Sequence, residues 1–463
     1  MKPILYIFLL TFFVNVALAQ PNKLKVSPDG RYLIYADSKK PFFWLGDTAW
    51  ELFHRLNREE ADEYLENRAK KGFTVIQAVV WAELVTKGDE NAYGQKPFIG
   101  DDFSKPNEAY FKHVDYIVNK AQSLGLYIAL LPVWGDKFNK KWGAGPEISQ
   151  PNLAYLYGQF LGNRYKTNNI IWVLGGDRNP ETPIHFEFIK QLARGIREGS
   201  ESGQLISYHP SGNSTSATFF HNESWLDFNM TQSGHGKKDY PNFLYMMSCY
   251  QLQPTKPTLD AEPRYEDIPV RFWEMKLPND WTKNPTAIPD TTFKFGWFDE
   301  YDIRRAGYWS ILAGACGHTY GHNSIWQMWE EKHEAVIPVK CTWKQALDKP
   351  GAIQMGLMRK FFESFAWNRM IPNQTLLITH WIDCGEYTIA SGDKNKKFVA
   401  VYSSAGKEFT INTQYLDGKN LKIKWFDPRK GEFFDEKVII KPLQQSFTPP
   451  YKGTDWALLI EAI

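Results

Sequence analysis

The stretch Ile170-Ile-Trp-Val-Leu-Gly-Gly-Asp-Arg-Asn-Pro180 decides how the rest of the chain is interpreted. Its first five residues are apolar and uncharged, which is typical of a strand covered on both faces, as in a parallel sheet. Two glycines then permit a sharp turn, because they lack a Cβ atom. We therefore expect Asp177 at the carboxyl end of a buried strand, where α/β folds place their chemistry. The alternative is that Asp177 only caps this turn or the helix that starts near Thr182.

Segments on both sides of this stretch repeat the order of strand and then helix. The runs expected as strands are 42–46, 73–80, 126–133, 170–174, 204–208, 226–231, 257–259 and 315–320. Helical patterns follow most of them, at 58–71, 107–124, 152–165, 182–197, 240–249 and 299–312. Strand and helix units in series predict a (β/α)8 TIM barrel rather than an open sheet.

The pattern changes from about Pro372. Short alternating runs follow at 387–390, 398–402, 421–426 and 456–460, and turn residues such as Gly392-Asp393 and Asp417-Gly418 separate them. This arrangement is typical of a small antiparallel β-sandwich. We therefore expect a catalytic barrel over residues 20–370 and a C-terminal β-sandwich over residues 371–463.

The N-terminal residues resemble a targeting segment. Lys2 precedes an apolar stretch over residues 4–16, and Ala17-Leu-Ala19 stands before Gln20. This pattern is typical of a secretory signal peptide over residues 1–19 with an A-x-A cleavage site, and its apolar part is too short for a membrane span. The sequence thus predicts export to the periplasm or the extracellular space, with no membrane span.

Composition narrows the function further. The 463 residues are 43% hydrophobic and 23% charged, which is a normal globular balance. A formal net charge of +2 offers no electrostatic basis for binding nucleic acid. Aromatic residues make up 16% of the chain, which is rich for a core alone and suits a cleft with flat apolar walls. The four cysteines are widely spaced and form no C-x-x-C pair.

Glu262 is the second carboxylate of interest. It follows Asp177 by 85 residues, which corresponds to about three barrel units of roughly 30 residues each. Strands four and seven would therefore each end in an acid, and the two carboxylates could flank one bond across the barrel mouth. Glycoside hydrolysis requires such a pair, in which one group protonates the leaving oxygen and the other attacks the anomeric carbon or activates water.

Other side chains near the predicted mouth could bind a carbohydrate. Asp47 ends the first strand and is expected to bind a sugar hydroxyl, the alternative being a structural role in its loop. The further candidates are Gln77, His209 and Gln232 for hydroxyl groups, and Trp50, Trp81, Trp134 and Trp142 for stacking on a sugar ring. Any one of these tryptophans or histidines could instead be structural, because lone residues of these types are often part of the core.

Sequence motifs for other kinds of catalysis are incomplete or missing. His333-Glu334 is not followed by a second histidine, because residue 337 is isoleucine, so the H-E-x-x-H zinc signature fails. There is no G-x-S-x-G elbow, P-loop or dinucleotide-binding fingerprint. We therefore expect hydrolysis that uses no cofactor and no metal.

Three motifs together make the chain resemble a known family. They are Trp44-Leu-Gly-Asp-Thr-Ala-Trp50, Trp172-Val-Leu-Gly-Gly-Asp-Arg-Asn179 and Leu259-Asp-Ala-Glu-Pro263. With the β-sandwich that follows, they resemble the apiosidases of glycoside hydrolase family 140, in which the C-terminal domain carries a collagen-binding label. The resemblance implies an exported enzyme that cleaves apiose from galacturonic acid in side chains of the pectin rhamnogalacturonan II, a plant cell-wall polysaccharide.

The resemblance also implies roles for the two carboxylates. By motif, Asp177 would be the acid/base and Glu262 the nucleophile of a retaining mechanism. Similar retaining barrels carry an Asn-Glu pair after strand four, whereas this chain has Gly176-Asp177, so the backbone must compensate for a shorter acid. Two alternatives stay open, namely a retaining glycosidase of another substrate, such as an arabinofuranoside or a galactoside, and a non-catalytic carbohydrate-binding protein.

Overall fold

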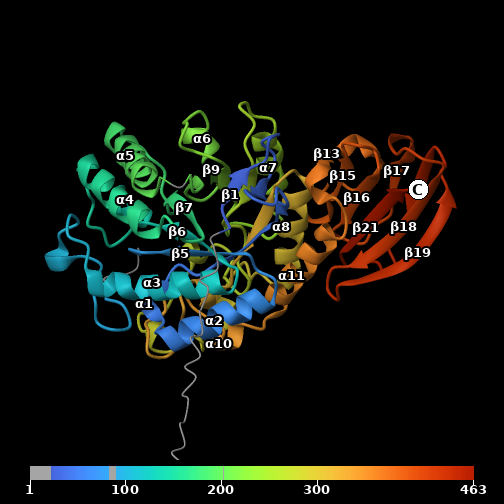
Figure 1. The fold of residues 1–463 in the computed structure, drawn as a ribbon. Coiled ribbons are helices and arrows are strands. Elements are labelled where there is room, and N and C mark those ends of the chain that lie inside the picture. The colour runs from blue at the N-terminus through green and yellow to red at the C-terminus, as the bar shows by residue number, and fades with distance from the viewer. Residues whose placement is uncertain (1–21, 83–89, 202) are drawn as a thin grey trace, which may run out of the picture.

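A parallel barrel forms the centre of the molecule (Figure 1). The computed structural model describes residues 22–82, 90–201 and 203–463, so the predicted signal peptide lies outside the described residues. The barrel strands are β4 (Trp44–Thr48), β5 (Val75–Val79), β6 (Tyr127–Leu131), β7 (Ile170–Gly175), β8 (Ile206–His209), β10 (Asn229–Gln232), β11 (Thr258–Asp260) and β12 (Gly317–Tyr320). β12 pairs with β4. The barrel closes between β8 and β10, where the amide of Asp227, just before β10, donates to the carbonyl of Ile206 in β8 at 2.9 Å. The predicted TIM barrel is thus confirmed.

Helices surround this barrel. They are α1 (Leu52–Arg55), α2 (Arg58–Lys70), α3 (Glu108–Ser123), α4 (Pro151–Tyr165), α5 (Pro183–Ser200), α6 (Ala217–Phe220), α7 (Phe243–Tyr250), α8 (Glu300–Leu312), α9 (Asn323–Trp326), α10 (Trp343–Ala346) and α11 (Pro350–Glu363). Local sequence explains their starts: Asn57 and Glu60 form a capping box on α2, and proline begins α4, α5 and α11. Within the described part of the chain, no helix has the length and apolar character to cross a membrane.

The first barrel strand ends later than predicted, at Thr48 instead of Gly46. Asp47 can stay inside this buried strand because its carboxylate is neutralised: Arg68 Nε lies 2.6 Å from Asp47 Oδ2, and the Tyr64 hydroxyl donates to the same oxygen at 2.8 Å. Both partners belong to α2. The alternation of side chains along a strand therefore turns Asp47 toward the helix layer rather than into the barrel.

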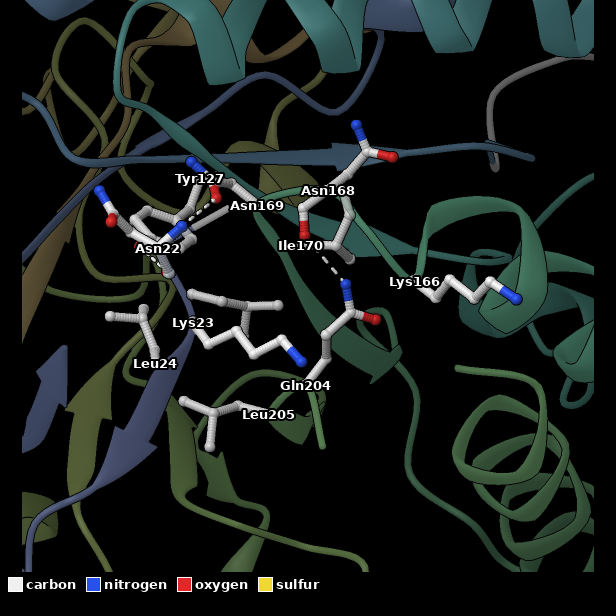
Figure 2. Close-up of a pocket in the computed structure, with 11 residues that line it drawn as sticks. Asn22, Lys23, Leu24, Tyr127, Lys166, Asn168, Asn169, Ile170, Gln204 and Leu205 are labelled. Atoms are coloured by element: carbon white, nitrogen blue, oxygen red, sulfur yellow. Dashed lines mark hydrogen bonds between the residues drawn. The ribbon is translucent and has the colours of Figure 1, made fainter. Parts of the chain in front are cut away.

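The chain before the barrel covers the amino ends of the strands. A small antiparallel sheet of β1 (Leu24–Val26), β2 (Leu33–Tyr35) and β3 (Pro41–Phe42) lies here. Elsewhere, a further short strand, β9 (Ser214–Thr215), pairs with the last two residues of β10. Asn22 donates from its amide to Asn169 Oδ1 at 3.2 Å (Figure 2). The hollow beside these residues measures about 20 Å³, which is room for about one water molecule. It is too small for a sugar ring.

The C-terminal domain is built from two antiparallel sheets. One has the order β13 (Met370–Pro372), β15 (Thr388–Asp393), β16 (Phe398–Ser403), β21 (Trp456–Ala462), β18 (Asn420–Asp427) and β19 (Glu432–Ile440), and the other β14 (Leu377–Thr379), β17 (Phe409–Asn412) and β20 (Gln444–Phe447). Buried side chains from both sheets, including Val399, Phe409, Trp425, Phe447 and Trp456, form one core. The predicted antiparallel β-sandwich is therefore confirmed.

A buried ion pair joins the two domains, which lie side by side along α8 and α11 (Figure 1). Arg304 of α8 donates from Nε and Nη2 to the two oxygens of Asp455, at 2.9 and 2.8 Å. The Tyr402 hydroxyl also donates to this carboxylate, at 3.0 Å. The Tyr308 ring stacks on Tyr402 with 4.6 Å between centroids, so apolar packing surrounds the pair. The sandwich and the barrel are thus expected to unfold together.

We expect Asp455→Ala to destabilise the whole chain by about 3 to 5 kcal/mol, because it leaves the Arg304 guanidinium buried and uncompensated. Urea unfolding followed by circular dichroism measures this change. Glu436→Ala is the matched control, since it breaks the exposed Lys422–Glu436 pair of the same domain and should leave the free energy of unfolding nearly unchanged. Equal effects of the two substitutions would contradict the proposed importance of the interdomain pair.

Candidate active site

The carboxyl ends of the barrel strands open into a cleft of about 500 Å³, a size that falls among small-ligand pockets. Asp177 and Glu262 both line it. The aromatic side chains in its wall are Trp50, Trp134, Trp142, Tyr265, Phe272, Trp273 and Trp326. The structure thus brings the two predicted carboxylates together in one cleft with a largely aromatic wall.

An unusual turn delivers Asp177 to this cleft. Gly175, Gly176 and Asp177 have φ values of 87°, 111° and 50°, so three successive residues adopt left-handed backbone conformations. The Gly176 amide donates to the His209 carbonyl at 3.0 Å, and the Gly135 amide donates to the Gly176 carbonyl at 3.0 Å. A Cβ atom on Gly176 would lie 2.8 Å from the Trp134 ring. Only glycine fits there, and the turn explains how a short acid reaches the cleft.

The guanidinium group of Arg178 supports both the backbone and the side chain of Asp177. Its Nη1 donates to the Asp177 carbonyl at 2.8 Å and lies 3.3 Å from Asp177 Oδ2. The guanidinium also stacks on the Trp142 ring, 3.9 Å from its centre, and donates to the Trp142 carbonyl. Trp142 itself remains 53% exposed on the cleft side. Arg178 therefore links the position of the acid to that of an exposed aromatic platform.

Two histidines hold Glu262. His209 Nε2 lies 3.2 Å from Glu262 Oε2, and His235 Nε2 lies 3.1 Å from Oε1. The backbone next to Glu262 is fixed as well, because Gln77 Nε2 donates to the Ala261 carbonyl at 3.0 Å. The Gly234 amide donates to the carbonyl of Glu262 itself, also at 3.0 Å. The carboxylate is thus immobilised at the end of β11.

These surroundings separate the proton affinities of the two acids. Burial raises the pKa of Asp177 to about 6, and the charge of Glu262 adds to this effect, while Arg178 opposes it. Burial also acts to raise the pKa of Glu262, but hydrogen bonds from His209 and His235 outweigh it and hold this pKa at about 2. Between these values Asp177 carries a proton and Glu262 is ionised, which is the arrangement of an acid beside a nucleophile or base.

Several other predicted residues also lie at the cleft. Trp50, Trp134 and Gln232 line it. The Trp50 ring meets Trp134 at 5.0 Å between centroids and His209 at 5.5 Å, with edge-to-face geometry in both cases. His209 is fully buried beneath them and reaches the cleft through Glu262. These residues line or underlie the part of the cleft that holds the two carboxylates.

The structure does not place Asp47, Gln77 and Trp81 in the cleft wall. Asp47 is bonded to α2, as described above, and has a structural role. Gln77 is fully buried and supports Ala261, so it acts on Glu262 through the backbone. Trp81 packs against Phe98 and Phe103, at 4.9 and 5.6 Å between ring centroids. The sequence identified the correct strand ends for these side chains but not the direction in which they point.

Sequence reasoning missed part of the site. His235, Tyr265, Trp273 and Trp326 all line the cleft but were not predicted. They lie in loops or in helices of only three or four residues, which are too short for a periodic pattern that would reveal a direction. One signal was present, since His235 stands between two glycines just after the sixth barrel strand, where a close approach to the mouth is expected.

One cluster outside the cleft has the residue types of a metal site. The ligand atoms of Asp267, His322 and Cys341 lie within 4.8 Å of one another. However, Lys340 Nζ lies 2.9 Å and Lys349 Nζ 3.1 Å from the Asp267 carboxylate. Two ammonium groups already neutralise this acid and would repel a cation, so we interpret the cluster as an ion-pair network.

Family comparison agrees with this geometry. The model described as "Apiosidase-like, catalytic domain" matches residues 27–369. The chain belongs to the apiosidase-like family. A second model, described as "Putative collagen-binding domain of a collagenase", matches residues 371–461 of this apiosidase-like chain. No match was found among curated proteins.

Solved structures share the arrangement of this apiosidase-like protein. A glycoside hydrolase is 30% identical with a TM-score of 0.82, over 95% of this chain and 97% of the other. A family 5 glycoside hydrolase from Bacteroides vulgatus is also 30% identical with a TM-score of 0.81, over 95% and 93% of the two chains. The apiosidase-like chain is therefore a glycoside hydrolase, with a carbohydrate as its substrate.

We expect Gly176→Ala to lower kcat/KM for an aryl glycoside substrate by about 100-fold, because the new methyl group pushes the Asp177 turn away from Trp134 and misplaces the acid. Gly125→Ala is the matched control. Gly125 also has a positive φ, of 76°, but no atom lies within 4 Å of its added Cβ. Steady-state kinetics and thermal unfolding of both variants separate misplacement from backbone strain. Similar loss in the two variants would contradict a special role of the turn.

Proposed function

We propose that this protein is a retaining apiosidase that cleaves apiose from galacturonic acid in side chains of rhamnogalacturonan II. The observation that carries the proposal is the pair Asp177 and Glu262, which share one tryptophan-walled cleft and differ in protonation. The apiosidase-like family match supports the choice of sugar. The signal-peptide pattern over residues 1–19 supports export to the periplasm or the extracellular space, where plant cell-wall fragments are met.

In the first step, the ionised Glu262 attacks the anomeric carbon. The bond from this carbon to the glycosidic oxygen breaks, and that oxygen takes the proton of Asp177. The products are the released galacturonic acid hydroxyl and an apiosyl ester on Glu262. His209 and His235 hold the attacking carboxylate in place, so little conformational freedom is lost when the bond forms.

In the second step, Asp177 acts as the base. Esterification removes the negative charge of Glu262, which had raised the pKa of Asp177, so the Asp177 carboxylate becomes the favoured form. It accepts a proton from water, the resulting hydroxide oxygen bonds to the anomeric carbon, and the ester bond to Glu262 breaks. Apiose leaves with the configuration that it had in the substrate, and both acids return to their starting states.

Azide rescue distinguishes the roles of the two acids. Glu262→Ala should lose at least about 1,000-fold in kcat on an aryl apioside, and azide should restore turnover with a glycosyl azide of inverted configuration. Asp177→Ala should keep its first step on a substrate with a good leaving group, and azide should then give the glycosyl azide of retained configuration. Product configuration by NMR decides. The same configuration from both variants would refute the assignment.

The substrate is tested with rhamnogalacturonan II fragments. The parent protein should release apiose, or an oligosaccharide that ends in apiose, and Glu262→Ala should release neither. Aryl arabinofuranosides and galactosides serve as comparison substrates, and we expect kcat/KM for the aryl apioside to exceed both by at least about 100-fold. Efficient cleavage of an arabinofuranoside or a galactoside instead would leave the glycosidase mechanism standing and overturn the proposed specificity.

A further inference from the structure

A second large cleft lies in the C-terminal domain, at the end of the β-sandwich where loops from both sheets meet. Its volume is about 620 Å³. The lining residues that can contact a ligand through a ring or a charged group are His380, Trp381, Glu386, Lys407, Glu408 and Lys452. The lining combines one large aromatic ring with many groups that can donate or accept hydrogen bonds. This combination is found where proteins bind small polar ligands that also carry apolar faces.

Trp381 lines this cleft, and neighbouring groups hold its side chain and backbone. It is 41% exposed. The Lys407 ammonium lies 3.8 Å from the centre of the ring and forms an ion pair with Glu386. The backbone is held as well, because the Thr388 amide donates to the Trp381 carbonyl at 3.0 Å. An exposed tryptophan that is already ordered loses little conformational freedom when a ligand stacks on it.

The charges around Trp381 suit a neutral ligand. Two carboxylates, Glu386 and Glu408, are balanced by two ammonium groups, Lys407 and Lys452. His380 adds no charge at neutral pH, because partial burial lowers its pKa. A lining without net charge gives no advantage to an anion or a cation, whereas it offers both acceptors and donors to hydroxyl groups. We propose that this cleft is a second carbohydrate-binding site, in which a neutral sugar ring stacks on Trp381.

Helix α8 holds this site in a fixed position relative to the catalytic cleft. Arg305 donates from Nη1 to the carbonyl of Gly385, at 3.3 Å, in the short segment that carries Glu386. It donates from Nη2 to the carbonyl of Lys238, which stands three residues after His235. The Tyr301 hydroxyl donates to the Ser404 carbonyl at 2.9 Å, beside the Ala405–Lys407 turn of the cleft. One rigid element thus contacts loops of both sites, so a glycan held at Trp381 is kept near the catalytic cleft.

Affinity electrophoresis tests the site without interference from hydrolysis. The parent for this experiment is the full chain with Glu262→Ala, and the gels contain rhamnogalacturonan II, arabinan or galactan. We expect at least one of these glycans to retard the parent, and Trp381→Ala to weaken that binding by at least tenfold. Ile382→Ala is the matched control, because Ile382 is the next residue, is 71% exposed and does not line the cleft. It should bind like the parent.

Two results would overturn the inference. One is equal retardation of the parent and Trp381→Ala, which would assign all binding to the catalytic cleft, and the other is no retardation of the parent by any of the three glycans. In the chain with an intact Glu262, Trp381→Ala should hydrolyse an aryl apioside at the parent rate. If no apioside is hydrolysed while retardation still depends on Trp381, the proposed apiosidase function fails and this second site stands.

Discussion

The site depends on one backbone constraint, the three successive left-handed residues from Gly175 to Asp177. Hydrogen bonds tie this turn to the strand ends on both sides, at His209 and at Gly135. Because a Cβ atom on either glycine would collide with a neighbouring strand end, the close packing of these three strand ends requires glycine at both positions. The turn places the aspartate carboxyl group in the cleft that Glu262 also lines.

Electrostatics then gives the two carboxyl groups different functions. Both are inside the same cleft, and burial alone would raise the pKa of each. Only Glu262 has two imidazole rings directed at its oxygens, and only Asp177 has a second carboxylate as its dominant charged neighbour. One group therefore holds a proton that the other has lost. The two histidines that lower the pKa of Glu262 stand at the end of β8 and in the loop after β10, so partners distant in the chain set this difference.

Helix α8 connects this chemistry to the C-terminal domain. Arg304 pairs with Asp455 inside the interface, while Arg305 contacts carbonyl groups of both the barrel loop beyond His235 and the sandwich loop at Gly385. A buried ion pair of this kind tolerates little change in geometry, because separation of its partners would leave two desolvated charges. The sandwich is consequently packed firmly against the barrel that carries the catalytic cleft.

The barrel, the sandwich and the strand ends that carry Asp177 and Glu262 could all be predicted from the order of residues along the chain. These follow from periodicity, turn residues and the regular length of barrel units, which are local properties of the chain. Which side chains at those ends face the cleft could be seen only in the folded chain. Asp47 turns to Arg68 on α2, whereas His235 and Tyr265 reach the cleft from irregular loops. The reason is physical: side-chain direction depends on partners that are distant in the chain, and a buried charge lies where its counter-charge is found.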